Sequence, residues 1–134
     1  MDQTLPAPRV KIIVADDHRD VRDVVCRTLA RCPYLEVVAA AESGEEAISL
    51  AILHEPNVVL MDAGMPGMGG IEATRRVKQA LPGTRVVGHS SRDAASDMKA
   101  AGASDFVEKG VPTQRLFEAI LQAAQAPSAC QEMT

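Results

Sequence analysis

Four short segments of this 134-residue chain hold side chains that could share one site, and each directly follows an apolar run. They are Asp16-Asp17, Asp62, Ser90-Ser91 and Glu108-Lys109. Carboxylates brought close together repel each other, and a cation between them offsets that repulsion. Carboxylate oxygens suit a hard divalent cation, and Mg²⁺ commonly combines one or two carboxylates with water and phosphate oxygens. The residue types therefore favour a magnesium site with a hydroxyl group and an ammonium group beside it.

Each of these side chains also has a simpler interpretation. An aspartate before a helix often only caps that helix, which would suffice for Asp16 or Asp17 taken alone. A lysine at a strand end is usually exposed, and Ser-Ser is typical of turns. A shared site is favoured because these residues recur at the ends of successive apolar runs.

The apolar runs have the length and composition of buried strands. Five strands are predicted, over Val10–Ala15, Leu35–Ala40, Val58–Met61, Arg85–His89 and Ser104–Glu108. Apolar residues recur at helical spacing after each run. This strict alternation predicts an α/β fold, in which a doubly wound parallel sheet of five strands carries helices on both faces. Ligands gather at the carboxyl ends of such strands, and this places all four segments on one edge of the sheet.

Local signals indicate where the helices begin and end. Ser43 and Glu46 form a capping box at the start of the second helix, and Gly102 is expected to end a short fourth helix over Asp93–Ala101. The apolar residues at helical spacing include Val21 and Val24 in the first helix and Ile52 in the second.

Composition limits the classes of function. The formal net charge of -4 offers no basic face, so we expect no direct nucleic-acid binding by this segment. No apolar run approaches the roughly 20 residues of a membrane helix. The three cysteines, Cys26, Cys32 and Cys130, lack metal-ligand spacing and are expected to be reduced thiols of a cytoplasmic protein. One domain over residues 9–125, between flexible tails at 1–8 and 126–134, is expected.

The set Asp16-Asp17, Asp62, Met65-Pro66-Gly67, Ser90 and Lys109 resembles the receiver domain of two-component response regulators. The resemblance covers about residues 9–125, and the stretches around Asp62 and before Lys109 are most similar to regulators of the NarL/FixJ/LuxR type, which usually carry a helix-turn-helix output domain. It implies the flavodoxin-like strand order 2-1-3-4-5. It also implies partners: a sensor histidine kinase or phosphotransfer protein, and an output domain or second copy.

The resemblance assigns a role to each site residue, and the protein would catalyse only its own phosphorylation and slow dephosphorylation. Asp62 would be the phosphoacceptor. Mg²⁺, or Mn²⁺ in its place, would be held by Asp16, Asp17, Asp62 and the backbone carbonyl of Gly64. Ser90, Lys109 and Phe106 would bind the phosphoryl group or respond to it, with Arg92, Ser91 and Ala63 as possible modulators. A turn residue is the less favoured alternative for Ser90, and a core residue is an equal alternative for Phe106. His89 is expected to be a packed or half-exposed strand residue, and His18 is expected to face solvent.

The chain departs from the family between Ser90 and Lys109, which are 19 positions apart. The family interval is longer by about three residues, close to one helical turn. The missing turn must come from the loop after the fourth strand or from the fourth helix, and a shortened fourth helix is predicted. Gly88 and His89 stand where an apolar pair is usual. Two other functions remain open: a receiver-like interaction module that acts independently of phosphorylation, and a magnesium-dependent phosphatase. The phosphatase is less favoured because Gly64 stands where such enzymes have a second carboxylate.

Overall fold

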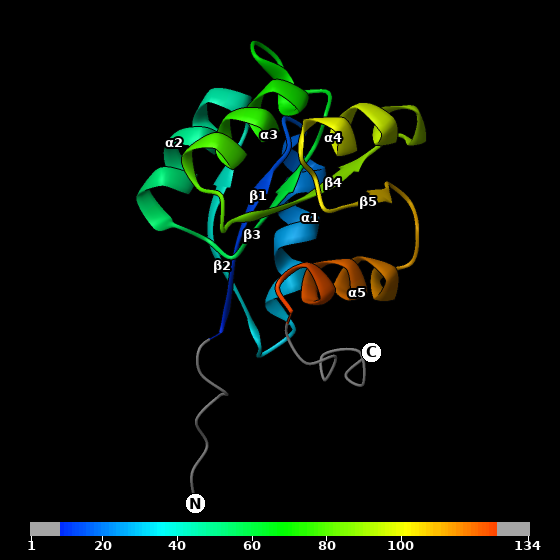
Figure 1. Cartoon of the computed structure of the whole chain (residues 1–134). Helices are drawn as coiled ribbons and strands as arrows, with labels where there is room; N and C mark the ends of the chain where they lie inside the picture. Colours follow the sequence, from blue (N-terminus) through cyan, green and yellow to red (C-terminus); the bar gives the residue numbers. More distant parts are fainter. Residues whose placement is uncertain (1–8, 126–134) are drawn as a thin grey trace, which may run out of the picture.

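Five parallel strands form one sheet in the order β2-β1-β3-β4-β5 in this computed structural model, which describes residues 9–125 (Figure 1). The strands are β1 (Val10–Ala15), β2 (Leu35–Ala41), β3 (Val58–Met61), β4 (Arg85–Ser90) and β5 (Asp105–Glu108). The helices are α1 (Arg19–Ala30), α2 (Gly44–His54), α3 (Gly69–Ala80), α4 (Ala95–Ala101) and α5 (Thr113–Ala123). The predicted α/β architecture, strand order and short fourth helix are confirmed. The predicted tails at 1–8 and 126–134 lie outside the described residues, and within 9–125 no helix is long and apolar enough to cross a membrane.

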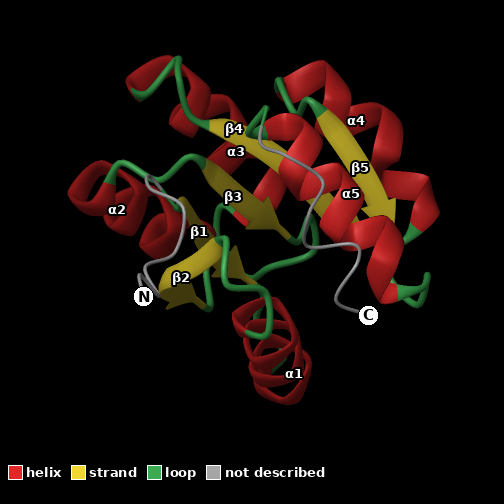
Figure 2. Ribbon diagram, turned by 90° about the horizontal axis from the view of Figure 1, so that it is seen from below, coloured by secondary structure: helices red, strands yellow, loops and turns green. Residues whose placement is uncertain are grey.

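Helices cover both faces of the sheet, so the strands are buried on both sides. The core on one face draws on α1 and α5, and the core on the other draws on α2, α3 and α4 (Figures 1 and 2). Along β1, Ile12 and Val14 belong to the first core, whereas Ile13 and Ala15 belong to the second. Successive side chains of a strand point to opposite faces, and this explains why β1 is apolar at almost every position.

The predicted helix signals are confirmed with small differences. Ser43 Oγ accepts a hydrogen bond from the Glu46 backbone N–H at 3.1 Å, and the Glu46 carboxylate accepts one from the backbone N–H of Glu42 at 2.8 Å. Gly102 ends α4 with a φ of 121°, a backbone conformation that favours glycine.

Several predicted boundaries move by one residue or more. β2 and β4 continue to Ala41 and Ser90, and β5 begins one residue late at Asp105. The segment Arg92–Ala94 is a 3₁₀ turn rather than part of the fourth helix, which begins at Ala95. The longer β4 follows from pairing that periodicity does not reveal, since Ser90 is in register with Glu108.

Three apolar residues expected on inner helix faces are exposed instead. The exposed fractions are 37% for Val21, 53% for Val24 and 53% for Ile52. α1 meets the sheet along one narrow stripe that contains Val25 and Leu29, four residues apart, and Val24 lies to the side of it, outside the core. Val21 continues the stripe but lines an open groove.

The two cysteines among the described residues differ in state, and Cys130 lies outside that part of the chain. Cys26 is a free thiol, whereas Cys32 is disulfide-bonded, so the expectation of reduced thiols is wrong for Cys32. Sequence spacing does not show which thiols meet in space, because this depends on the distance between their backbones and on the direction of their side chains.

An open groove of about 460 Å³ lies between α1 and α5, and His89 is one of the residues that line it. Its other lining residues include Asp20, Val21, Val24, Lys109 and Leu116. Burial lowers the pKa of the His89 imidazole, and the positive charge of Lys109 lowers it further against the opposing effect of Asp16 and Asp62. His89 is therefore a packed strand histidine, as predicted, and the fold favours its neutral form.

We predict that His89 makes folding stability depend on pH near neutrality. A depressed pKa in the folded state gives stability that is complete above the unfolded value of about 6.5 and is lost as the pH falls toward the folded value. The unfolding free energy of the wild type should therefore drop relative to that of His89→Gln between about pH 7.5 and about pH 5.5. Urea titrations at several pH values measure this, and parallel curves for the two proteins would contradict it.

Gly70 lies where α3 approaches the end of β3. A Cβ atom on Gly70 would collide with the carbonyl oxygen of Asp62, and it would lie 2.9 Å from the Ala63 Cα atom. Both contacts are with backbone atoms, so neither can be relieved by a change of side-chain rotamer. The close approach of α3 to the Asp62 segment therefore requires glycine at this position.

We predict that Gly70→Ala destabilises the protein by about 2 kcal/mol or more, because the backbone must shift to admit the methyl group. Gly83→Ala is the matched control, since a Cβ at Gly83 meets nothing within 4 Å. The control should change the unfolding free energy by less than about 0.5 kcal/mol. Equal effects of the two substitutions in urea unfolding would show that the close approach does not constrain the fold.

Candidate functional site

Backbone hydrogen bonds at the carboxyl edge of the sheet hold the candidate residues. The Asp16 N–H donates to the Ala41 carbonyl and the Asp62 N–H donates to the Ala15 carbonyl, both at 2.9 Å. The Lys109 N–H donates to the Ser90 carbonyl at 2.9 Å. These bonds continue the sheet one residue past each strand, so the side chains that follow the strands start from fixed positions. The predicted shared edge is confirmed.

Lys109 joins the two most buried carboxylates of the site. Its Nζ atom lies 2.7 Å from Asp16 Oδ2 and 3.1 Å from Asp62 Oδ2. The side chains of Asp16 and Asp62 are only 4% and 5% exposed. Two buried carboxylates repel each other strongly, and the shared ammonium offsets that repulsion. The simpler interpretation of Lys109 as a free surface lysine does not describe its position.

The charges of this cluster stabilise one another. Burial alone would raise the pKa of the Asp16 carboxyl, but hydrogen bonds from Lys109 and from the His18 backbone N–H hold that pKa below its usual value. Burial alone would lower the pKa of the Lys109 ammonium, but its hydrogen bonds to Asp16 and Asp62 raise that pKa above its usual value. Both groups therefore stay charged at neutral pH.

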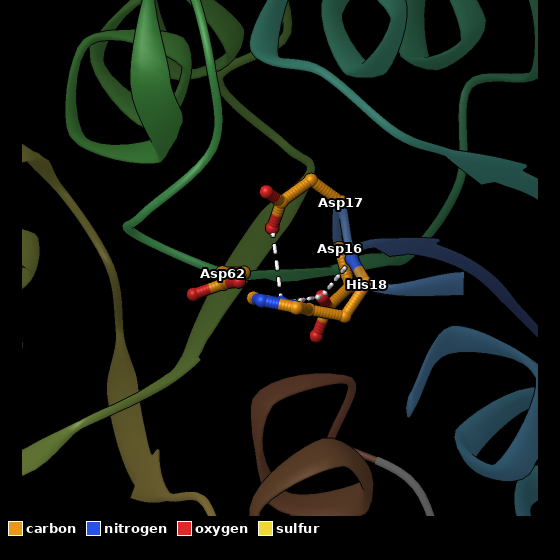
Figure 3. A group of neighbouring side chains, drawn as sticks. All are labelled: Asp16, Asp17, His18 and Asp62. Carbon is orange, nitrogen blue, oxygen red and sulfur yellow. Dashed lines mark hydrogen bonds and ion pairs between the residues drawn. The ribbon is translucent and has the colours of Figure 1, made fainter. Parts of the chain in front are cut away.

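Asp17 and His18 complete the group on the β1 side (Figure 3). His18 Nδ1 lies 3.3 Å from Asp16 Oδ1 and 3.2 Å from Asp17 Oδ1. The His18 side chain is 66% exposed, so it faces solvent as expected. Its contacts with the two carboxylates were not expected. The sequence feature that could have predicted these contacts is the position of His18 directly after Asp17.

The residues present fit a divalent cation. Asp16, Asp17, His18 and Asp62 each offer one ligand atom, and these atoms lie within 4.8 Å of one another. Asp17 Oδ1 is buried and, within residues 9–125, has no hydrogen-bond partner, since its contact with His18 is close but not aligned as a hydrogen bond. A buried carboxylate oxygen without a partner is costly, and a cation would remove that cost.

The loop that follows Asp62 is held at both ends. The Gly64 N–H donates to Asp62 Oδ1 at 3.1 Å, and the Gly70 N–H donates to the Ala63 carbonyl at 3.0 Å. Gly64 therefore lies beside the Asp62 carboxylate, where it was expected, and its observed contact is through the amide.

The remaining candidates lie on β4, β5 and the turn between β4 and α4. Ser90 is buried at the end of β4. The Ser91 hydroxyl donates to Asp93 Oδ1 at 2.6 Å. Arg92 Nε lies 3.6 Å from Glu108 Oε1, and the Arg92 side chain is 86% exposed. Ser91 and Arg92 therefore make contacts with other residues of this region, and the structure draws neither into the carboxylate cluster.

Phe106 and Gly88 pack as a pair. They are in register on β5 and β4, and a Cβ on Gly88 would lie 2.6 Å from Phe106 Cδ1 and 3.2 Å from Met98 Cε. The missing side chain of Gly88 thus gives the aromatic ring its place on the sheet. This packing agrees with the core interpretation of Phe106, and its role as a responsive residue stays a prediction.

Comparisons with known proteins agree with this geometry. Residues 12–121 match the model of the response regulator receiver domain. The chain is 35% identical over 128 residues to the transcriptional regulatory protein DegU of Brevibacillus brevis, covering 93% of this chain and 54% of that protein. It is 38% identical over 116 residues to the response regulator GacA of Pseudomonas aeruginosa, covering 84% and 54%. The chain thus spans about half the length of these curated relatives.

Solved structures give the same answer. The receiver domain of the response regulator NarL from Mycobacterium tuberculosis has a TM-score of 0.81 at 32% identity, covering 89% of this chain and 98% of that one. A LuxR-family response regulator from Aurantimonas has a TM-score of 0.82 at 33% identity, covering 93% and 94%. Five parallel strands, an acidic edge with a lysine, and these matches agree: the chain belongs to the response regulator receiver family and resembles the NarL/LuxR-type transcriptional regulators of two-component systems.

Proposed function

We propose that this receiver accepts a phosphoryl group on Asp62 from a phosphohistidine of a sensor histidine kinase or phosphotransfer protein. The observation that carries the proposal is the environment of the Asp62 carboxylate, which is buried at the sheet edge. Its Oδ2 atom accepts a hydrogen bond from Lys109, and its Oδ1 atom accepts one from the Gly64 amide. Both oxygens are fixed before the donor arrives, and such positioning is a large part of phosphoryl-transfer catalysis.

The transfer is a displacement at phosphorus. A carboxylate oxygen of Asp62 forms a bond to phosphorus while the bond from phosphorus to the donor imidazole nitrogen breaks, and the imidazole leaves with that electron pair. Lys109 stands within hydrogen-bond distance of Asp62 and would neutralise charge on the phosphoryl oxygens. The product is an acyl phosphate on Asp62.

Asp16, Asp17, Asp62 and the Gly64 carbonyl would hold Mg²⁺, or Mn²⁺ in its place. The bound ion supplies positive charge beside the transferred phosphoryl group. The Asp16 carboxylate would serve both the ion and Lys109. Its Oδ2 atom faces Lys109, and its Oδ1 atom, which faces His18, would be the one beside the ion. Loss of either Asp16 or Asp17 would therefore remove part of the ion site.

The response to phosphorylation would start at Ser90, which is buried at the end of β4 and tied through its carbonyl to Lys109. Its hydroxyl would turn to the phosphoryl group, and Phe106 would adjust on β5. The face made of α4, β5 and α5 would then change its affinity for a partner, a second copy or an output domain. Ser91 and Ala63 would modulate the site from the adjoining loops.

The proposal extends to the output that this receiver would control. One curated relative is a transcriptional regulatory protein and another is a response regulator, and the matched stretch makes up about half of each. The receiver would control such an output in the cytoplasm without touching nucleic acid itself. Its chemistry would be limited to its own phosphorylation and slow dephosphorylation. A receiver-like module that acts without phosphorylation is the alternative, and the short α4 of seven residues is the feature that favours it.

We predict that incubation with Mg²⁺ and acetyl phosphate adds the mass of one phosphoryl group to the intact protein. The gain should be absent from Asp62→Asn and from wild type treated with a chelator, and Lys109→Met should slow it by about 10²-fold or more. Asp97→Asn is the control, because Asp97 is an exposed aspartate of α4. A wild type that gains no mass with any phosphodonor would favour the phosphorylation-independent module.

We predict that Arg92 prolongs the life of the phosphoryl group by reaching its oxygens as an ion-pairing fork. Arg92→Ala should shorten that lifetime by about two- to fivefold, the effect of an exposed ion pair. Glu108→Gln should lengthen it, because Glu108 competes for the Arg92 guanidinium. Decay of the phosphorylated proteins measures both effects, and three equal lifetimes would rule out the role.

A further inference from the structure

His18 is held with its ring against the carboxylates of the site. Its backbone N–H donates to Asp16 Oδ1 at 2.8 Å, and its carbonyl accepts from the Arg22 N–H at 2.8 Å. Arg22 Nη1 also donates to the Asp16 carbonyl at 2.8 Å. The turn that joins β1 to α1 is therefore fixed on both sides of His18, and the ring points toward Asp16, Asp17 and Asp62 (Figure 3).

The spacing of the ring nitrogen matches a coordination shell. In an octahedral site with bonds of about 2.1 Å, neighbouring ligand atoms lie about 3.0 Å apart. His18 Nδ1 lies 3.3 Å from Asp16 Oδ1 and 3.2 Å from Asp17 Oδ1, so each distance is close to one edge of such a shell. In the structure, the contact with Asp16 Oδ1 is a hydrogen bond. One ligand atom from each of Asp16, Asp17, His18 and Asp62 lies within 4.8 Å of the others, so an ion could replace the ring proton there.

The chemistry of the neighbouring atoms also points to a cation. Asp17 Oδ1 is buried and lacks a hydrogen-bond partner among the described residues. A nitrogen among carboxylate oxygens carries either a proton or a metal ion, because a bare lone pair would be repelled by them. Imidazole can change tautomer and leave the Nδ1 lone pair free without a change in charge.

Lys109 leaves this side of the cluster open. Its ammonium group takes the Oδ2 atoms of Asp16 and Asp62, whereas His18 faces the Oδ1 atoms of Asp16 and Asp17. An ion bound beside His18 therefore need not displace Lys109. The ammonium and the ion would share the charge of Asp16 from opposite sides.

We infer that His18 is a nitrogen ligand of the divalent ion and gives this site a preference for borderline transition ions such as Co²⁺ and Zn²⁺. Carboxylate, carbonyl and water ligands suit Mg²⁺, and an added imidazole shifts the preference toward these ions. The inference rests on the proposed function, because the ion is the one that would assist phosphorylation of Asp62. It assigns to His18 a metal selectivity that three carboxylates alone would not give.

Metal binding without any phosphodonor tests the inference. Co²⁺ binding is followed by its visible absorption and Mg²⁺ binding by competition, at about pH 8 where an ordinary imidazole is neutral. His18→Ala should weaken Co²⁺ binding by about tenfold or more and change Mg²⁺ binding by less than about threefold. His54→Ala is the matched control, since His54 lies in the last turn of α2, and it should change neither affinity.

A second measurement reads the wild type directly. Zn²⁺ titration followed by imidazole ¹⁵N NMR should move the His18 Nδ1 resonance and leave those of His54 and His89 in place. This readout remains valid even where His18→Ala perturbs folding.

The outcomes separate the inference from the proposed function. Unchanged Co²⁺ affinity in His18→Ala, with both ions lost in Asp17→Asn, would overturn the role of His18 and leave the magnesium site intact. Tighter binding of both ions in His18→Ala would show that the ring competes with the ion, and this also overturns the inference. A wild type that binds neither ion would overturn the inference together with the metal-dependent part of the proposed function.

Discussion

The repulsion between the buried carboxylates of Asp16 and Asp62 is the constraint on which this site depends. They follow adjacent strands, β1 and β3, and are brought together by the sheet itself. The charge that offsets their repulsion comes from Lys109, which follows β5 at the far edge of the sheet. The site therefore forms only when β4 and β5 have both paired in register with the sheet. Lys109, which follows the last strand in the chain, then stabilises the charge of Asp16, which follows the first.

The loops of the site are supported from outside the sheet edge. The Met68 N–H approaches Glu45 Oε2 at 3.4 Å, and a Cβ on Gly67 would lie 2.9 Å from the same carboxylate oxygen. Glu45 belongs to the first turn of α2, so a helix that contributes no ligand still positions the segment after Asp62. The burial of Asp62 and the course of this loop are thus set by contacts between α2, α3 and β3.

Much of this arrangement could be predicted from the sequence, because the signals are local. Apolar runs that end in Asp16, Asp62, Ser90 and Lys109 predicted the strands, and the topology of parallel sheets then placed these residues on one edge. The contacts that were missed join segments far apart or depend on side-chain direction. Periodicity could not show that Gly88 faces Phe106, that α1 turns Val24 outward, or that the His18 ring meets two carboxylates. The state of Cys32 is of the same kind, since it depends on a meeting in space.

The fit of the Phe106 ring over Gly88 has a consequence for the energy of any switch. A ring that leaves this place uncovers a backbone position with no side chain of its own, and the space it vacates is bounded by the thioether of Met98. An unfilled void of that size is costly, whereas a flexible methionine can move into part of it. Packing alone thus favours the observed orientation of the Phe106 ring. The free energy that favours it depends on how much of the vacated space the Met98 side chain can fill.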